Sequence, residues 1–334
     1  MSLPVENLNI TWKTLDNTSA KSLHSLIHKI EVCDCVTYNT EEYEIQEIFE
    51  SEQKYCIGGF TPDNELIAYA VIKTTLDKKT VHCLGGVDPQ YRGIGIGTYL
   101  LSTYEQITVE MLKDDFDKNN KVKFLNHNPK KEGYVVVEIN DTKKELKLKL
   151  DELGFLPKNR FYELRKKIDK PYKHILLPTY KKIVDWQENL EELVRKTNNN
   201  IGEQYLNLPT LDIQQWQYYM RNANKKWCKI LLDKSTDRSK IIGYIVSSKY
   251  EQDWKVLNHK EAYIDLITVI PKKEQSILVK ALIQSYINTC IDDGLDYVAI
   301  GLEPDKQPEL YNILMEMGFE VSNSSTEYVK SIQI

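Results

Sequence analysis

The sequence contains the same strand–proline–helix pattern twice, and this repeat restricts the chain to a duplicated α/β fold. A strand-like run ends in Val-x-Pro at residues 87–89 and is followed by a long helical pattern, and the same order recurs at 269–271. The valine-rich run 134–139 recurs at 297–302, and its β-branched residues predict a buried strand. A Gly-Phe pair follows the last helical pattern of each copy, as expected at a helix end. Two copies of one unit explain the length of 334 residues better than two unrelated domains.

Strand-like and helix-like segments alternate through the first copy and predict a mixed α/β (α+β) sheet. Periodicity and turn residues predict strands at 10–15, 55–60, 66–74, 80–87, 134–139 and 160–166, and helices at 19–33, 41–50, 94–112 and 142–153. The segment 168–178 holds two prolines and predicts a linker between domains at 1–168 and 175–334. The first copy is longer after its long helix, which predicts an inserted surface loop at 113–132 rather than a substrate lid.

Composition excludes several classes of protein. Hydrophobic residues make up 41% and charged residues 28%, which suits packed cores rather than a disordered chain. The formal net charge of −5 argues against a nucleic-acid partner. No apolar run reaches the roughly 20 residues that cross a bilayer, and the N-terminus lacks a signal-peptide pattern, so we expect no membrane partner and a cytoplasmic protein. The six cysteines, among them Cys33 and Cys35, lack further metal ligands nearby, so we expect reduced thiols and no metal.

Three glycines at alternate positions, Gly93, Gly95 and Gly97, open the long helix of the first copy. Because the chain has only 14 glycines, this cluster indicates a backbone that comes close to a ligand. The free N–H groups and the dipole of a helix N-terminus favour an anion, so the segment predicts a phosphate or pyrophosphate site. The segment is not a Walker loop, because Gly97 and not a lysine precedes Thr98. It is not a dinucleotide fingerprint either, because its spacing is Gly-x-Gly-x-Gly and not Gly-x-Gly-x-x-Gly. The alternative without a ligand is a helix start that merely packs tightly.

This segment closely resembles the pyrophosphate loop of the GNAT (GCN5-related N-acetyltransferase) superfamily. The family pattern Gln/Arg-x-x-Gly-x-Gly/Ala is met by Gln90, Gly93 and Gly95, and Arg92 begins the frequent Arg-Gly-x-Gly-Ile-Gly version. The order of hairpin, strand, glycine loop, long helix, strand and helix also agrees with the family. The resemblance covers about residues 8–167 and, more weakly, most of the second half. The chain is therefore similar to a tandem GNAT protein with two acyl-CoA N-acyltransferase-like domains.

The resemblance implies that acetyl-CoA (CoA) binds as a co-substrate, without a metal, where two central parallel strands separate. The strand that ends at Val87 would lie along the pantetheine arm, and the backbone N–H of Val87 would face the thioester oxygen. Val87 is thus the one position with an expected catalytic role. The positions that the resemblance assigns to cofactor binding are Gly85, Val87, Gln90, Arg92, Gly93, Ile94, Gly95, Ile96, Gly97, Thr98 and Asn140.

The second copy lacks the glycine loop. When the two Val-x-Pro motifs are aligned, Lys272 replaces the glutamine and Glu274 the arginine of the motif. Gln275, Ile277 and Val279 replace the three glycines. These side chains would block a phosphate, and the acid would repel it. We therefore expect one cofactor site, in the first half, and a structural or substrate-shaping role for the second half.

The acid and base positions depart from the pattern of the resembling family. Relatives often carry Glu or His four or six residues before the strand-ending valine, where this chain has Cys83 and Val81. His82 lies between them and is expected on the opposite face of the strand. Leu150 stands where the family often has a tyrosine as general acid. The candidates that remain for acid and base are Tyr134, Glu138 and Tyr162.

The resemblance implies an N-acetyltransferase that moves an acetyl group from acetyl-CoA to the amine of a small molecule or peptide, by direct attack in a ternary complex. The missing acid and base leave an alternative from another class, a catalytically weak acyl-CoA sensor or scaffold. A nucleotide-dependent enzyme is a third and more distant alternative, and a nucleophilic role for Cys83 is a further minor one. The chain is expected to be a monomer or a homodimer.

Overall fold

The computed structural model describes residues 9–50, 54–75, 79–119, 132–206, 210–270 and 274–333, with the side chains of all but 114–119 and 205–206. The chain forms two compact units. Unit 1 comprises Met1–Arg160 together with Ser325–Ile334, and unit 2 comprises Phe161–Ser324.

Unit 1 is a mixed sheet with helices on both faces. Within the described residues its strand order is β1-β2-β3-β4-β5-β12, and neighbouring strands are antiparallel except for β4 and β5, which are parallel. Its elements are β1 (Thr11–Thr14), α1 (Ala20–Asp34), α2 (Glu42–Glu50), β2 (Lys54–Phe60), β3 (Leu66–Thr74), β4 (Thr80–Val87), the short helix η3 (Pro89–Tyr91), α3 (Ile96–Asn119), β5 (Glu132–Asn140), α4 (Lys144–Glu152) and the later part of β12 (Glu320–Gln333).

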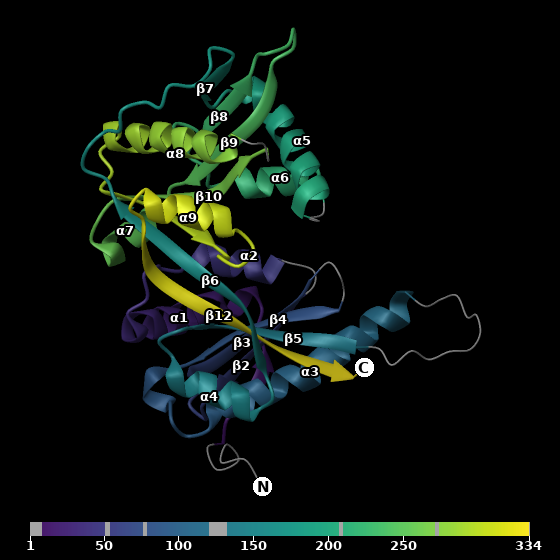
Figure 1. Ribbon diagram of the computed structural model, residues 1–334. Helices are drawn as coiled ribbons and strands as arrows, with labels where there is room; N and C mark the ends of the chain where they lie inside the picture. Colours follow the sequence, from purple (N-terminus) through teal and green to yellow (C-terminus); the bar gives the residue numbers. More distant parts are fainter. Residues whose placement is uncertain are drawn as a thin grey trace, which may run out of the picture. The chain divides into compact units, whose positions relative to one another are not determined.

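Each face of the unit 1 sheet has its own core. Along β3, Ala68, Ala70 and Ile72 pack under α3, whereas the alternate residues Tyr69 and Val71 pack under α1 and α2. This alternation follows from the two-residue period of a strand. Figure 1 shows α1 and α3 on opposite sides of the sheet, so both surfaces of its central strands are covered.

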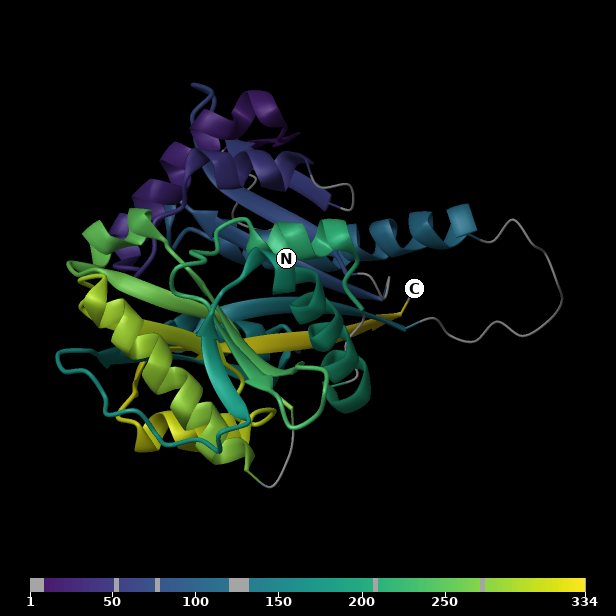
Figure 2. The same cartoon turned by 90° about the horizontal axis from the view of Figure 1, so that it is seen from above.

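Unit 2 repeats this arrangement. Its strand order is β6-β11-β10-β9-β8-β7, and the one parallel pair among its described residues is β10 with β11. Figures 1 and 2 show α8 and α9 on one face and α5 and α6 on the other. Its elements are the later part of β6 (Leu156–Lys167), β7 (Lys181–Asp185), α5 (Glu191–Ile201), α6 (Ile213–Met220), β8 (Lys229–Asp233), β9 (Lys240–Ser248), α7 (Glu251–Leu257), β10 (Glu261–Val269), α8 (Gln275–Asp292), β11 (Tyr297–Leu302) and α9 (Pro308–Glu316).

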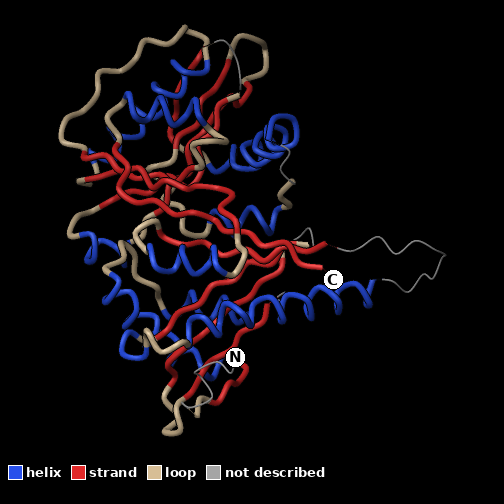
Figure 3. The backbone as a smooth tube through the Cα atoms, turned by 60° about the horizontal axis from the view of Figure 1, so that its bottom comes forward, coloured by secondary structure: helices blue, strands red, loops and turns tan. Residues whose placement is uncertain are grey.

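Two long strands divide their residues between the units. Strand β6 begins in unit 1 and ends in unit 2, where it pairs with β11 from Tyr162 to Lys167. Strand β12 begins in unit 2 and ends in unit 1, where it pairs with β5 from Ser325 to Gln333. Figures 1 and 3 show this last strand running along β5 to the C-terminus. The observed units therefore differ at their edges from the linear ranges 1–168 and 175–334, since each copy receives a strand from the other.

The predicted mixed sheet and its duplication are confirmed. Helix α3 is longer than the helix predicted at 94–112, since it runs from Ile96 to Asn119. Most of the loop predicted at 113–132 lies in residues 120–131, outside the described part of the chain. Within the described residues, no helix is both long and apolar enough to span a bilayer.

Candidate functional site

The parallel strands β4 and β5 of unit 1 separate before they end. Their pairing runs from Thr80 opposite Tyr134 to Cys83 opposite Val137 and stops there. Each strand nevertheless keeps its outer partner to its last residue, because Val87 still pairs with β3 and Asn140 with β12. The result is a gap between the carboxyl ends of β4 and β5, the usual location of ligands in sheets with parallel strands. This is the separation of central strands that the resemblance to the GNAT family implied.

Strand β4 turns free backbone groups toward this gap. The N–H of Asp88 donates to the carbonyl of Ile67 at 2.8 Å, which makes these two residues a hydrogen-bonded pair of the antiparallel ladder. Because such pairs alternate with pairs that are not hydrogen-bonded, the N–H and C=O groups of Val87 and Gly85 point away from β3 and toward β5. Since β5 has already diverged, both N–H groups remain available to a ligand.

The turn after β4 is held by Asp88, which is only 1% exposed. Its carboxylate accepts a hydrogen bond from the backbone N–H of Gln90 at 2.9 Å and forms a salt bridge with Lys29 at 3.2 Å. The chain then passes through Gly93 and Gly95, whose φ angles are +78° and +98°. Residues with a Cβ rarely adopt such angles, so the backbone conformation requires glycine at both positions. The side chain of Gln90 is exposed.

Helix α3 begins at Ile96 and leaves a row of backbone donors unused. Within the described residues, none of the backbone N–H groups from Gly93 to Thr98 has an acceptor, and the first return bond of the helix is from Tyr99 to Gly95 at 3.0 Å. Ile94 is 40% exposed, whereas Ile96 is buried and anchors the helix in the core. Adjacent free N–H groups at a helix N-terminus form a binding site for an anion. Most of the loop positions proposed from the sequence therefore lie together at this helix end.

Arg92 connects the loop to two other elements. Its Nε donates to the carbonyl of Val87 at 3.1 Å, and its Nη1 and Nη2 donate to the two oxygens of Asp34 at 2.6 and 3.2 Å. Lys143, just before α4, also forms a salt bridge with Asp34 at 2.8 Å. Partial burial would raise the pKa of Asp34, but the hydrogen bonds from Arg92 and Lys143 outweigh it and lower that pKa. The carboxylate is thus charged at neutral pH.

Asn140 ends β5 on the other side of the gap. Its side-chain oxygen accepts hydrogen bonds from the backbone N–H and the hydroxyl of Thr142, at 2.9 and 2.6 Å. These bonds form the turn that leads into α4. The structure therefore gives Asn140 a turn-forming role, and a contact with the pantetheine arm remains a prediction.

Among the candidate acids and bases, Glu138 lies nearest to the gap along the chain. It is the first residue of β5 after the last pair with β4, it is exposed, and its carboxylate accepts a hydrogen bond from Ser325. On β4, His82 and Leu84 are exposed on the same face, as expected from the strand alternation. Tyr134, in contrast, lies four residues earlier on β5 and donates to Glu132. Tyr162 belongs to unit 2.

Two buried groups border the gap on the side of α3. Burial raises the pKa of the Cys83 thiol to about 12, so this cysteine is a neutral packing residue and not a nucleophile. The second group is Tyr104, which was not among the candidates predicted from the sequence, and its hydroxyl would lie 2.3 Å from a Cβ added to Gly85. Burial raises the pKa of Tyr104 well above its usual range, so its phenol stays protonated. Its only signal in the sequence was a place on the apolar stripe of α3, four residues after Leu100.

The corresponding region of unit 2 has a gap without the loop chemistry. Pairing between β10 and β11 stops at Ile264 opposite Ile300, so these strands also separate. At the start of α8, however, Glu274 forms a salt bridge with Lys181, and the Gln275 side chain donates to the Val269 carbonyl at 3.4 Å. Glu274 and Gln275 thus occupy the positions of Arg92 and Gly93, as the aligned sequences predicted, whereas Lys272 lies outside the described residues.

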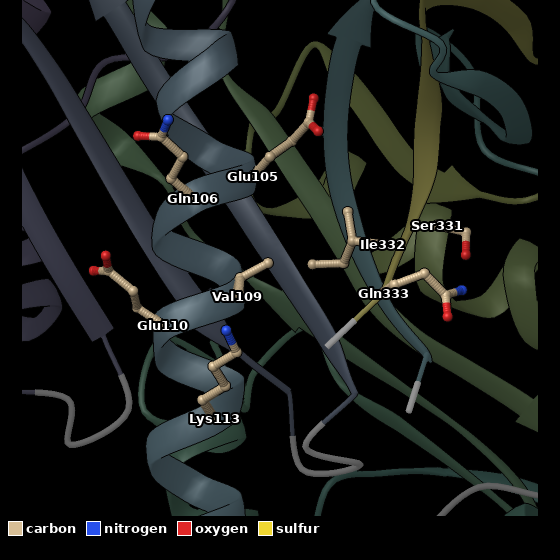
Figure 4. Close-up of a pocket in the computed structure, with 8 residues that line it drawn as sticks. All are labelled: Glu105, Gln106, Val109, Glu110, Lys113, Ser331, Ile332 and Gln333. Carbon is tan, nitrogen blue, oxygen red and sulfur yellow. The ribbon is translucent and has the colours of Figure 1, made fainter. Parts of the chain in front are cut away.

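A separate pocket of about 560 Å³ lies farther along α3, between this helix and the end of β12. In Figure 4 Val109 and Ile332 face each other across it, while Gln106 and Glu110 point away. Its lining residues are Glu105, Gln106, Val109, Glu110, Lys113, Ser331, Ile332 and Gln333. The pocket shares no residue with the loop or the strand gap. Within the described part of the chain, no group of acids, histidines and cysteines could hold a metal ion.

Comparisons with known proteins agree with this geometry. Residues 23–126 match the model of the acetyltransferase (GNAT) family. A solved GCN5-related N-acetyltransferase from Sphaerobacter thermophilus is 16% identical with a TM-score of 0.72, over 97% of this chain and 96% of that one. A tandem GNAT protein from the clavulanic acid biosynthesis pathway is 10% identical with a TM-score of 0.69, over 97% and 98% of the two chains. An acetyltransferase of the GNAT family from Colwellia psychrerythraea is 10% identical with a TM-score of 0.57, over 96% and 100%.

No curated protein matched the sequence. At such low identities the solved structures establish the fold, and the family model establishes the family of the segment that contains the glycine loop. Residues 23–126 thus carry a domain of the acetyltransferase (GNAT) family, in a chain with the fold of a tandem GNAT protein.

Proposed function

We propose that the protein is an N-acetyltransferase that transfers an acetyl group from acetyl-CoA to an amine, and that unit 1 binds the acetyl-CoA. The observation that carries this proposal is the continuous set of free backbone donors, from Gly85 and Val87 in the gap to residues 93–98 at the start of α3. A diphosphate fits the helix N-terminus, and an extended amide-containing arm fits the edge of β4.

In this arrangement the free N–H groups from Gly93 to Thr98 bind the diphosphate of CoA. The pantetheine arm extends into the gap along β4. The N–H of Val87 then donates to the thioester oxygen, where negative charge develops during attack. A preorganised backbone donor of this kind needs no side chain, which accounts for a site whose best-defined contacts all come from the main chain.

The reaction needs no covalent enzyme intermediate. The neutral amine nitrogen attacks the thioester carbon, the carbon–sulfur bond breaks, and the acetyl group remains on nitrogen. We assign the acceptance of the amine proton to the Glu138 carboxylate, directly or through water, because Glu138 lies just past the last β4–β5 pair. The departing thiolate takes up a proton, and the protonated Tyr104 beside Gly85 is a candidate donor.

The proposal assigns one acetyl-CoA to each chain. Unit 2 keeps the strand gap, but its helix start carries the Glu274–Lys181 salt bridge where a diphosphate would have to approach. The acceptor would be a small-molecule or peptide amine. All six cysteines are free thiols, which suits the reducing cytoplasm, and we place the reaction there.

The second candidate function is an acyl-CoA sensor or scaffold with little turnover. Two observations favour it: Cys83 is an inert thiol where relatives often carry an acid or base, and Leu150 is fully buried at the position of the expected tyrosine. A sensor would use the same amides for binding but would need neither Glu138 nor Tyr104.

Thiol release from acetyl-CoA with a panel of amines separates the two functions. The transferase account expects release that depends on one class of amine, that falls at least about tenfold in Glu138→Gln, and that falls again in Tyr104→Phe. Glu327→Gln is a matched control, because Glu327 faces Glu138 on the neighbouring β12. Tight acetyl-CoA binding without release for any amine would contradict the transferase and support the sensor.

A further inference from the structure

Asp34 joins two cations that belong to opposite sides of the strand gap. Arg92 contacts it through both terminal nitrogens, at 2.6 and 3.2 Å, and Lys143 contacts it at 2.8 Å. The Asp34 side chain is 15% exposed, so water screens these contacts only in part. A two-point guanidinium–carboxylate contact also fixes orientation, which a single ion pair does not.

Both cations are in turn fixed to the ends of the diverging strands. Arg92 is tied to the end of β4, because its Nε donates to the carbonyl of Val87 at 3.1 Å. Lys143 is tied to the end of β5, because its backbone N–H donates to the carbonyl of Asn140 at 3.0 Å. Asp34 therefore completes a series of hydrogen bonds and ion pairs from the last residue of β4 to the last residue of β5. We name this series of contacts the Asp34 bracket.

We propose that Asp34 is a positioning residue: the Asp34 bracket fixes the separation of the carboxyl ends of β4 and β5, and so the width of the gap that receives the acyl-pantetheine arm. This inference rests on the proposed function. The strands have no direct pairing beyond Cys83 and Val137, so the bracket supplies the connection that pairing supplies elsewhere in the sheet. It also holds the carbonyl of Val87, the residue whose N–H is assigned to the thioester oxygen.

Loss of the Asp34 bracket should affect binding of the diphosphate and of the acyl-pantetheine arm differently. The backbone donors at 93–98 that bind a diphosphate do not belong to the bracket, and Asp34 adds a negative charge near them. Asp34→Asn therefore leaves diphosphate affinity unchanged or increases it. The same substitution releases the two strand ends, so affinity for the acyl-pantetheine arm and the rate of transfer both decrease.

The experiment compares ADP, which has the diphosphate without the pantetheine arm, with acetyl-CoA on the full chain. In Asp34→Asn we expect the dissociation constant of ADP to stay the same within about twofold or to fall, that of acetyl-CoA to rise about tenfold, and kcat to fall about tenfold, since a 1 Å misplacement can cost up to about a hundredfold. Asp34→Glu keeps the charge and should restore part of both losses. Glu65→Gln is the matched control. It removes a half-exposed carboxylate that pairs with Lys29, a residue on the same helix as Asp34, α1.

Each outcome decides between the claims. An Asp34→Asn protein with an unchanged ratio of the two dissociation constants, or with equal losses for ADP and acetyl-CoA, overturns the bracket while the proposed function stands. No rescue by Asp34→Glu, with the same melting temperature as the wild type, also overturns it. A wild-type chain that binds no acetyl-CoA contradicts the proposed function itself.

Discussion

At the scale of single residues, Gly85 is the position with the least room for a side chain at the gap. An added Cβ would lie 2.3 Å from the Tyr104 hydroxyl and 2.7 Å from the backbone carbonyl of Tyr69. The carbonyl belongs to the paired strand β3 and cannot move without disturbing the sheet. Gly97, by contrast, has only Val87 at 4.0 Å, an ordinary contact.

Gly85→Ala should therefore destabilise the protein by about 1–3 kcal/mol through overpacking and should reduce acetyl-CoA binding. Gly97→Ala is the matched control, and its alanine in the first turn of α3 should be neutral or stabilising by up to about 1 kcal/mol. Urea unfolding of both variants measures the difference. Equal stability of the two variants would mean that Gly85 is not confined as described.

Asp265 is a buried acid in unit 2 with an unsatisfied oxygen. It lies at the irregularity of β10 between Ile264 and Leu266, where its Oδ1 accepts a hydrogen bond from the Tyr250 hydroxyl at 3.0 Å. Its Oδ2 is buried without a hydrogen-bond partner among the described residues. Burial raises the pKa of Asp265 above the ordinary 3.8. The charged form is thus disfavoured in the folded state.

Asp265→Asn should stabilise the protein at pH 7 by on the order of 1 kcal/mol, because the buried charge is removed and Tyr250 keeps an acceptor. The folded state binds the Asp265 proton more tightly than the unfolded state. The Asp265 contribution therefore lowers stability as pH rises through the interval between 3.8 and the raised pKa. Denaturant midpoints of the two proteins should coincide at low pH and diverge toward pH 7, and a constant difference across that range would contradict this account.

At the scale of elements, β12 shows how the last residues of the chain complete the first unit. Tyr328 and Ile332 lie on β12 and are buried in the same core as α3 and β5. The pairing with β5 continues to Gln333 opposite Glu132. A C-terminal strand at the surface often tolerates change, but here it pairs with β5, one of the two strands of the candidate site.

Ile332→Ala should cost about 2–5 kcal/mol, the usual range for a large-to-small change in a core, and the loss should appear in unit 1. Hydrogen exchange of the β5 amides provides the local measurement. Val321→Ala is the control on the same strand, since Val321 is 43% exposed and lies in unit 2. Faster exchange in Val321→Ala than in Ile332→Ala would contradict the assignment of the end of β12 to unit 1.

At the scale of the whole molecule, the sequence predicted the duplication and the glycine loop from short motifs of neighbouring residues, and the resemblance to the GNAT family implied the parallel central strands. Gly93, Gly95 and the strand-ending Val87 are one local motif. The strand exchange was not predictable, since β12 is distant in the sequence from its partner β5 and their pairing depends on how residues such as Tyr328 pack in the core. The Asp34 bracket was also hidden, because Arg92 and Asp34 are 58 positions apart and each reads as an ordinary surface charge.

The central claim is that the free backbone N–H groups of unit 1, and of unit 1 alone, bind the diphosphate of acetyl-CoA. Titration calorimetry of the full chain with acetyl-CoA tests it most directly, with Gly95→Glu beside the wild type and Ile277→Glu, the equivalent change at a half-exposed position of unit 2, as control. We predict one molecule bound per chain, binding lost in Gly95→Glu and unchanged binding in Ile277→Glu. Two molecules bound per chain, or undiminished binding in Gly95→Glu, would contradict the account.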